Sequence, residues 1–496
     1  MTIRLSENTP EQSSLIIPLV AGAHLPASLE AISQKFGLTN TSIAQHFKAT
    51  KGAVIPLYPN NLQNIFLLGL GSQVDAMTCL SAFQGLSHQY KKQLSKTVCI
   101  DWEVAFANSS ESELARWIEA GTNGLLLGTY AIGKYKSQAS QGHPLQQESA
   151  GIYLNSPFKE SAALLSAASA GRQTADTQMR ILDMVNAPGN KLRPIDMAHW
   201  VAESAQRHHY KVRIIEKEEA QKIGLQALLA VNRGSEWPPA FIIAEYEPSE
   251  NSGDLPHFGL VGKGVTFDTG GLSIKGANNM HYMKSDMGGA AAVLGSIELC
   301  ARLQIPARVT AIVPTTDNCV DAMSIKPGDI IGSYSGKTIE VIDTDAEGRL
   351  ILADGLAYME KHFAPDVMID LATLTGSCVR ALGYHAAGLF TQNDQLADAL
   401  REAARVSGEG LWRLPLWEAY QKDLESDVAD IKNLGGPVAG AITAAKFLEN
   451  FTSHHPCWAH MDIAGVAFGN SIFSQQKSAT AYGIRLLTQL IRSWKP

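Results

Sequence analysis

Two stretches of the sequence, residues 260–289 and 341–350, place acidic side chains after a run of apolar residues. In the second stretch, Asp343, Asp345 and Glu347 alternate with other residues, so in an extended segment their side chains point the same way. Carboxylates this close repel one another, and the repulsion together with partial burial raises their pKa values. A bound cation would remove the conflict. The alternative is a turn in which an aspartate caps the helix that follows.

The first stretch, residues 260–289, combines several glycines with Lys263, Asp268 and Asp286. A glycine and a lysine follow a predicted strand here, but the spacing that a P-loop or a dinucleotide-binding loop requires is absent. Asp268 and Asp286, with Asp345 and Glu347, carry four negative charges, which two divalent ions would neutralise. Lys263 beside them is either an ammonium that balances one carboxylate or a neutral amine that binds metal, and the spacing leaves both alternatives open.

At these residues the sequence resembles the leucyl aminopeptidase family of dinuclear-metal exopeptidases. The signature octapeptide of that family is N-T-D-A-E-G-R-L, and positions 343–350 of this chain read D-T-D-A-E-G-R-L. Asp343 therefore departs from the signature and adds a carboxylate, either as a neighbour of the metal ligands or as a capping residue. The resemblance covers essentially all of 188–496 and is loose before that; further blocks that match lie at 263–271, 283–289, 371–376, 440–445 and 458–465.

The resemblance implies five metal ligands: Lys263, Asp268, Asp286, Asp345 and Glu347. Asp268 and Glu347 would bridge both ions, and Asp345 would complete the more exchangeable site. Lys263, as a neutral amine, and Asp286 would complete the tighter site. Zn²⁺, Mn²⁺ and Co²⁺ all suit a set of oxygen ligands with one nitrogen, so ligand type alone does not distinguish them, although we expect Zn²⁺ or Mn²⁺.

The resemblance also implies the residues that act on the substrate. Lys275 would stay charged and polarise the scissile carbonyl, and Arg349 would hold a bicarbonate ion that acts as general base. Met283, Thr373 and Gly376 match positions that line the pocket for the first side chain of the substrate.

The function implied is that of a metalloaminopeptidase. It would release N-terminal amino acids, preferably Leu, Met or similar apolar residues, by attack of a water that two divalent ions activate. The resemblance also implies a homohexamer with peptides as substrates. One alternative is a dipeptidase of the same family, acting for example on cysteinylglycine. A less well supported alternative is a regulatory protein that binds DNA.

The composition limits the remaining functional classes. A net charge of -7 and the lack of a basic run give no reason to expect nucleic acid as a partner. The six cysteines are scattered and include no C-x-x-C pair, which suits a reducing compartment. No apolar run approaches the roughly 20 residues needed to span a bilayer, and the polar N-terminus does not resemble a signal peptide. We therefore expect a cytoplasmic protein without a membrane partner.

The elements that position these residues alternate between strands and helices, which predicts an α/β fold. We expect a smaller N-terminal α/β domain at 1–159, a connecting helix and linker at 160–187, and a larger catalytic domain at 188–496 with a mixed, mostly parallel sheet flanked by helices. In such sheets, ligands bind beyond the carboxyl ends of the strands. Predicted strands are 15–20, 64–70, 240–246, 258–261, 309–313, 338–342 and 367–371; predicted helices are 111–120, 160–184, 290–303 and 351–362; 137–149 is predicted to be an exposed loop.

Three residues within or beside the matching blocks are predicted to be structural: His460, Asp462 and Cys378. His460 and the nearby Asp462 suggest part of a metal site or a catalytic triad, but the family does not use them as ligands. Cys378 has no neighbouring base in the sequence, so it is predicted to be a small buried core residue.

Overall fold

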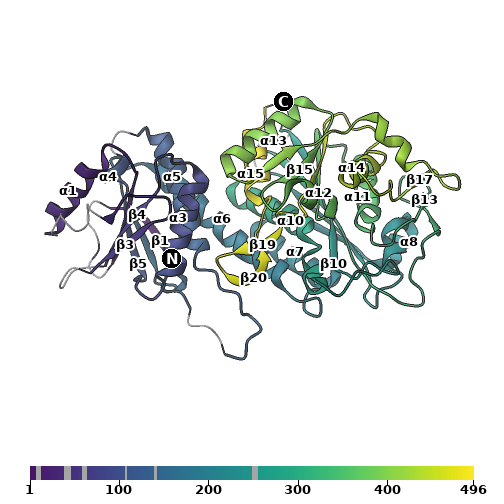
Figure 1. Cartoon of the computed structure of the whole chain (residues 1–496), viewed down its shortest axis with the longest axis horizontal. Coiled ribbons are helices and arrows are strands. Elements are labelled where there is room, and N and C mark those ends of the chain that lie inside the picture. The colour runs from purple at the N-terminus through teal and green to yellow at the C-terminus, as the bar shows by residue number, and fades with distance from the viewer. Residues whose placement is uncertain are drawn as a thin grey trace. The chain divides into compact units, whose positions relative to one another are not determined.

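The computed structural model describes residues 1–6, 10, 13–37, 46–58, 64–106, 109–138, 142–248 and 255–495 (Figure 1). The chain divides into two compact units, Met1–Met179 and Arg180–Pro496. The change from one unit to the next falls inside a long helix, α6 (Ala162–Asn186), in the Ala-rich stretch where a helix was predicted. The division into three parts at 1–159, 160–187 and 188–496 stays a prediction.

The first unit is built on a six-stranded sheet in the order β1-β6-β5-β2-β4-β3. All its pairings are parallel except that of β3 with β4. Every residue of β2 and β4 is buried, as expected of strands covered on both faces. The strands are β1 (Thr2–Leu5), β2 (Ser14–Leu19), β3 (Val54–Leu57), β4 (Ile65–Gly69), β5 (Thr97–Asp101) and β6 (Gly151–Asn155); the helices are α1 (Leu25–Phe36), α3 (Ala76–Gln89), α4 (Glu103–Phe106) and α5 (Glu111–Leu127).

Helix α5 begins with a capping box, in which Ser110 and Glu113 each bond the backbone N–H of the other. The exposed loop predicted at 137–149 is partly wrong. Residues 139–141 lie outside the described residues, but Pro144–Gln146 forms a short 3-10 turn, and His143 and Leu145 are buried. His143 holds this turn in place, because its ring bonds both Leu145 N and Ser87 O. The polar composition of the stretch gave no indication that its apolar residue, Leu145, is buried.

The second unit contains a nine-stranded sheet in the order β16-β15-β18-β14-β9-β11-β8-β7, with β10 paired to β11. Its pairings are mostly parallel, which confirms the predicted mixed α/β fold. The strands are β7 (Lys211–Ile215), β8 (Ala240–Tyr246), β9 (His257–Gly262), β10 (Gly264–Asp268), β11 (Arg308–Asn318), β14 (Val367–Ala372), β15 (Ala387–Phe390), β16 (Leu411–Arg413) and β18 (Trp458–Asp462).

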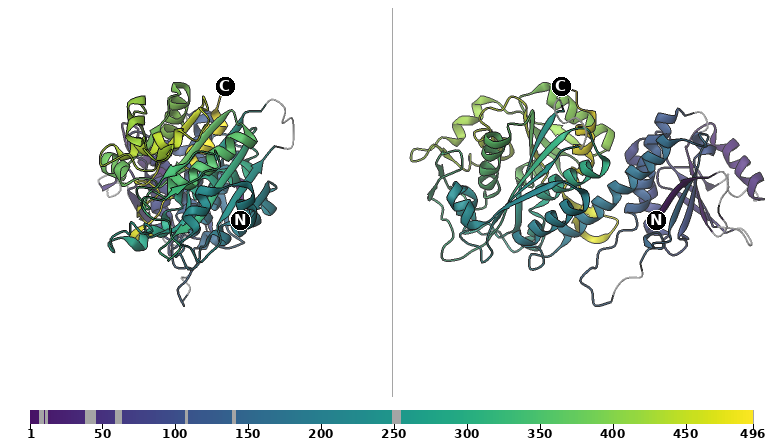
Figure 2. Two further views of the ribbon diagram at one scale, coloured as in Figure 1. Left: turned by 90° about the vertical axis from the view of Figure 1, so that its right-hand side faces the viewer. Right: turned by 180° about the vertical axis from the view of Figure 1, so that it is seen from behind.

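Helices cover both faces of this sheet (Figure 2). On one side α10 (Gly288–Leu303) packs with α7 (Pro194–His208) and α15 (Ile484–Ser493). On the other side α11 (Gly348–Phe363) packs with α9 (Gln226–Asn232) and α14 (Gly440–Glu449). The remaining elements are η2 (Met280–Ser285), η3 (Glu418–Leu424), α8 (Lys217–Ile223), α12 (Gly376–Leu382), α13 (Asp394–Ser407), a small sheet of β12 (Ile330–Ile331), β13 (Ile339–Glu340) and β17 (Ile431–Lys432), and the hairpin of β19 (Phe468–Ser471) and β20 (Ser474–Ala479).

Five neighbouring strands of the large sheet, β9, β10, β11, β14 and β18, run in the same direction. Their carboxyl ends therefore meet at one edge, which is where ligands bind in sheets of this kind. None of the helices in the described ranges is both long enough and apolar enough to cross a lipid bilayer.

Candidate metal centre

The carboxyl edge of the large sheet gathers the side chains singled out in the sequence. Lys263 directly follows β9, Asp268 ends β10, and Thr373 directly follows β14. Asp286 follows the 3-10 helix η2, and Glu347 stands immediately before α11. Residues far apart in the sequence are thus brought together by strand ends and helix starts.

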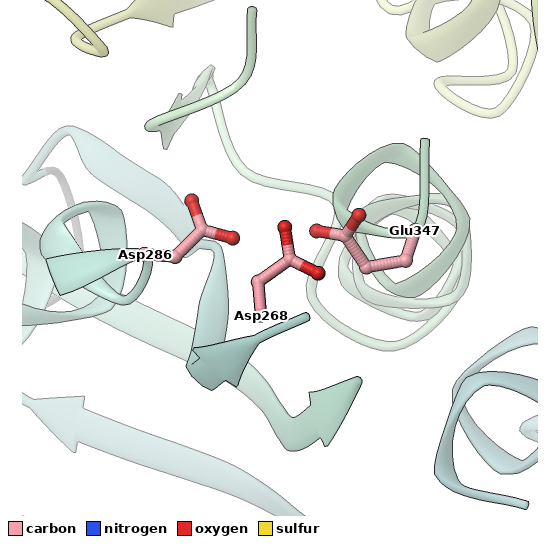
Figure 3. A group of neighbouring side chains, drawn as sticks. All are labelled: Asp268, Asp286 and Glu347. Atoms are coloured by element: carbon pink, nitrogen blue, oxygen red, sulfur yellow. The ribbon is translucent and has the colours of Figure 1, made fainter. Parts of the chain in front are cut away.

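Three carboxylates form the centre of this cluster. Asp268, Asp286 and Glu347 are all buried, and one oxygen of each lies within 4.8 Å of the others. In Figure 3 the three carboxyl groups point toward one another, with that of Asp268 between the other two. Such a group of oxygens can bind a divalent cation.

Asp345 lies next to this group and is linked to it through a lysine. Lys275 Nζ is 2.7 Å from Asp268 Oδ2 and also forms an ion pair with Asp345. Burial alone would lower the pKa of Lys275, but the surrounding carboxylates, Asp268 first among them, outweigh it and raise the pKa. Lys275 is therefore a fixed positive charge at the edge of the cluster.

Lys263 is buried inside the cluster. Its Nζ lies 2.7 Å from Asp286 Oδ2 and 2.9 Å from Glu347 Oε1, and it donates a hydrogen bond of 3.0 Å to Thr373 O. Burial opposes the charged form, but the charges of the neighbouring carboxylates prevail and raise the pKa of this amine. In this arrangement Lys263 balances negative charge.

Asp286, Glu347 and Asp345 resist ionisation. Burial is the largest cause in each case and neighbouring carboxylates add to it, so that the pKa of Asp286 lies well above its ordinary value and that of Glu347 is also raised. The pKa of Asp345 is raised to about 7. Both oxygens of Glu347, Oδ2 of Asp286 and Oδ1 of Asp345 are buried and accept no well-aligned hydrogen bond from the described residues, although lysine nitrogens lie at ion-pair distance. Buried oxygens in this condition favour a cation.

The segment that carries Asp345 and Glu347 is not extended, so the condition under which its three acidic side chains would point the same way is not met. Asp343 Oδ1 accepts a bond of 2.8 Å from Asp345 N, which makes a turn. The side chain of Asp343 thus caps the loop in which it lies. An asparagine, the residue in the family signature, can make the same bond through its side-chain oxygen. The alternative, a turn whose aspartate caps the next helix, is right about the turn but wrong about the cap, because the residue at the start of α11 is Glu347 and it makes no side-chain cap bond.

Arg349 is buried in the first turn of α11. Its Nη1 donates a bond of 2.8 Å to the backbone oxygen of Asn433. Burial lowers its pKa to about 10 despite the opposing charges of Glu347, Asp462 and Asp343, so the guanidinium stays charged at neutral pH.

Of the three predicted pocket residues, Met283 and Thr373 are directly connected to Asp286. Met283 belongs to η2, which leads directly into Asp286, and Thr373 Oγ1 donates a bond of 2.7 Å to Asp286 Oδ1. Gly376 is the first residue of α12 and is exposed. Cys378 is buried, in agreement with the prediction of a core residue.

His460 and its neighbour Asp462 have separate surroundings. His460 is fully buried, and its Nδ1 lies 2.6 Å from the carboxylate of Asp370. Asp462 accepts bonds from Leu374 N and from Thr375 Oγ1, and so holds the segment after β14 whose Thr373 bonds both Lys263 and Asp286.

Sequence reasoning missed the buried polar residues that hold the charged ones. Asn318, at the end of β11, donates to Asp268 Oδ1 at 2.9 Å and to Thr344 O at 3.0 Å. Asn433 bonds the loop before α11. In the sequence, Asn318 follows a predicted strand, but nothing there marked it as a partner of Asp268, and Asn433 gave no signal at all.

The chain is similar to known aminopeptidases in both sequence and structure. The sequence profile of the cytosol aminopeptidase family, catalytic domain, matches residues 180–488. A probable cytosol aminopeptidase of Chloroherpeton thalassium is 40% identical over 511 aligned positions, covering 100% of both chains. Among solved structures, a mutant of tomato leucine aminopeptidase has a TM-score of 0.88 at 29% identity, covering 99% of this chain and 96% of that one. The bottromycin maturation enzyme BotP in complex with Mn has a TM-score of 0.83 at 30% identity, covering 97% of this chain and 99% of that one.

Proposed function

The chain belongs to the cytosol aminopeptidase family and is a metallo-exopeptidase of the leucyl aminopeptidase type, and from this premise we propose how it acts and on what. It releases N-terminal amino acids, preferably Leu, Met or similar apolar residues, from peptides. Its metal centre holds two divalent ions, Zn²⁺ or Mn²⁺. The observation that carries the proposal is the group of three buried carboxylates whose oxygens lie within 4.8 Å of one another.

The residues present fit a pair of cations. Asp268, Asp286, Asp345 and Glu347 supply four negative charges, and several of their oxygens are buried without a well-aligned partner among the described residues. Lys263 Nζ is the one nitrogen ligand we propose. The bound Mn of BotP supports an ion of this kind. Bound ions supply a lowered pKa for a water and polarisation of the scissile carbonyl.

The amine of Lys263 must lose its proton to act as a ligand. The charges that raise its pKa belong to Asp286, Glu347 and Asp268. A cation bound to these carboxylates offsets their negative charge and repels an ammonium group, so it would lower the pKa of the Lys263 amine. Lys263 would then turn from a counter-charge into a ligand without leaving its place.

Lys275 has a different proposed role, because it lies at the edge of the cluster and its side chain is 23% exposed. Because water can still reach this amine, we propose that it stays positive and donates a hydrogen bond to the oxygen of the scissile carbonyl as negative charge develops there. Arg349 is also charged and is held by Asn433 O, and we propose that it would hold a bicarbonate ion, which would supply a general base.

The preference for the first residue of the substrate depends on Met283, Thr373 and Gly376. Met283 offers an adaptable apolar surface, and Gly376 leaves room because it has no side chain. Thr373 is fixed by its bond to Asp286, so the pocket is tied to the metal centre. We further propose, from the family resemblance, that the enzyme works in the cytoplasm and assembles as a homohexamer.

The test starts with the purified protein dialysed against a strong chelator. We expect hydrolysis of leucine anilide to be lost and then restored by Mn²⁺ or Zn²⁺, with about two ions bound per chain. Leucine anilide with an acetylated amine should not be cleaved, and leucine and methionine anilides should be cleaved faster than glutamate anilide. Full activity with no metal detected by elemental analysis would contradict the proposal. Cysteinylglycine in the same panel tests the dipeptidase alternative, which predicts that it is the best substrate.

A matched pair of variants links the activity to the buried carboxylates. Glu347→Gln removes a proposed bridging ligand, and we expect metal content to fall and kcat to drop about a thousandfold. Glu409→Gln is the control, because Glu409 is also a buried glutamate of the second unit but caps α15 through Gly483 N and Leu486 N. It should retain both metal and activity.

A further inference from the structure

The loop between β13 and α11 carries two of the proposed metal ligands but has little regular structure. β13 ends at Glu340 and α11 begins at Gly348, so residues 341–347 have no strand or helix of their own to hold them. Asp345 and Glu347 lie in this loop, and Arg349 follows it. Some other part of the chain must set the positions of these side chains.

Asn433 binds this loop from a segment 90 residues after Asp343 in the sequence. β17 runs parallel to β13, and directly after it Asn433 N donates a bond of 2.9 Å to Glu340 O. The side chain of Asn433 then lies beyond the strand ends, beside the loop, and is fully buried.

The amide group of Asn433 uses all of its bonding capacity on that loop. Its Oδ1 accepts from Ile342 N at 2.7 Å and from Asp343 N at 3.3 Å. Its Nδ2 donates to Asp343 O at 2.7 Å and to Ala346 O at 3.4 Å. An amide that takes two N–H groups and gives two bonds to carbonyls fixes both the start and the end of the turn.

The backbone of Asn433 continues the same function. Its carbonyl oxygen accepts the bond of 2.8 Å from Arg349 Nη1. One residue therefore holds the loop that bears Asp345 and Glu347 and also the guanidinium that follows it.

We propose that Asn433 is a positioning residue for the metal centre, which sets the places of Asp345, Glu347 and Arg349 without touching metal or substrate. This inference rests on the proposed function of those three residues. Removing the amide leaves buried N–H and C=O groups of the loop without partners, and the loop moves to find new ones. A displacement of about 1 Å at a reacting centre costs roughly a hundredfold in rate, and partners of metal ligands typically affect metal affinity by about 10- to 100-fold.

The experiment compares Asn433→Ala with Asn393→Ala in the full-length protein. Asn393 is the matched control, since its side chain also joins distant segments of the second unit, through Leu396 N and Pro456 O, but at the start of α13. Calorimetric titration with Mn²⁺ alone should show at least a tenfold loss of affinity for Asn433→Ala and no loss for Asn393→Ala. With saturating Mn²⁺, kcat for leucine anilide should fall about a hundredfold while KM changes by less than about threefold, because the loop bears no pocket residue. Both metal-free variants should still melt cooperatively, which shows that the loss of affinity in Asn433→Ala is not a loss of the fold.

Asn433→Asp tests the same idea if Asn433→Ala fails to fold. It keeps the shape and the accepting oxygen but replaces the two donated bonds by a second oxygen that faces the carbonyls of Asp343 and Ala346. We expect it to lose metal affinity as well. Wild-type affinity and kcat in either folded variant would overturn the role of Asn433 alone. A wild-type protein that binds no Mn²⁺ and cleaves leucine anilide without it would overturn the proposed function itself.

Discussion

At the scale of single residues, the two lysines of the metal centre differ in burial more than in charge. Both amines form ion pairs with carboxylates, and neighbouring charges raise the pKa of each. Lys263 is almost wholly buried between Asp286 and Glu347, whereas Lys275 retains 23% of its side-chain exposure. This difference in burial is the reason why we propose Lys263, and not Lys275, as a metal ligand.

This difference predicts different effects of removing each amine. We expect Lys275→Ala to retain its metal, because Lys275 is not a proposed ligand, while kcat falls by about 100- to 1,000-fold through loss of a donor to the developing oxyanion. Lys263→Ala should lose metal as well as activity. Elemental analysis and steady-state kinetics on the two variants check this. Equal loss of metal in both would show that Lys275 is structural.

At the scale of elements, close contacts between helix starts and strand ends decide the geometry of the site. Gly348 is the first residue of α11, and a Cβ added there would lie 2.3 Å from Lys263 Cε. Gly270, at φ +88°, occupies the left-handed region in the turn after β10, where a Cβ would also lie 2.9 Å from Asp345 Oδ1. Glycine at these positions lets the lysine and the carboxylates reach the same space.

Gly348→Ala tests this contact. Because the added methyl group would overlap Lys263, we expect the lysine to be displaced, metal affinity to fall at least tenfold, and activity to fall with it. Gly85→Ala is the control, since Gly85 lies inside α3 and a Cβ there meets nothing within 4 Å. It should leave activity unchanged and raise the melting temperature slightly. Unchanged Mn²⁺ affinity in Gly348→Ala would contradict the argument.

At the scale of the whole molecule, the large sheet contains a buried titratable group that makes stability depend on pH. His257 begins β9, and its Nε2 lies 2.8 Å from Thr310 Oγ1 of the neighbouring strand β11. Burial, assisted by the charge of Arg308, lowers its pKa from 6.5 to about 4. The unfolded chain therefore takes up a proton below about pH 6.5 that the folded chain does not take up until about pH 4.

His257 should thus contribute stability that is present above pH 6.5 and lost as the pH falls toward 4. We expect His257→Gln to have a lower melting temperature at pH 7.5 but a weaker decrease between pH 6.5 and pH 4.5. The difference in slope should correspond to about one proton. Melting curves of both proteins across this range, in the same metal-free buffer, check the prediction, and parallel slopes would contradict it.

The sequence by itself determined the class of the fold and most of the residues that gather at the site. Apolar runs of strand length alternate with helical patterns, which indicates an α/β fold. Where such a run is followed by a charged residue, the strand is expected to end, because the strand is buried inside the sheet and the charged side chain is placed at the edge of the sheet. Elements such as α6, α10 and β14 were predicted within a few residues. The octapeptide at 343–350 identified the carboxylates, because it is specific to one family.

Only the tertiary structure decided how those residues are held. Local spacing suggested an extended segment at 343–347, but Asp343 closes a turn that depends on Asn433, a residue brought there by the pairing of β13 with β17. Asn318 supports Asp268, and Asp462 supports the segment after β14, in the same way. These bonds join strand ends that are tens of residues apart, and the pattern of one stretch of sequence contains no information about which distant side chain will lie against it. The charged residues of the site could therefore be identified from the sequence, whereas their geometry depends on the pairing of strands that are far apart in the sequence.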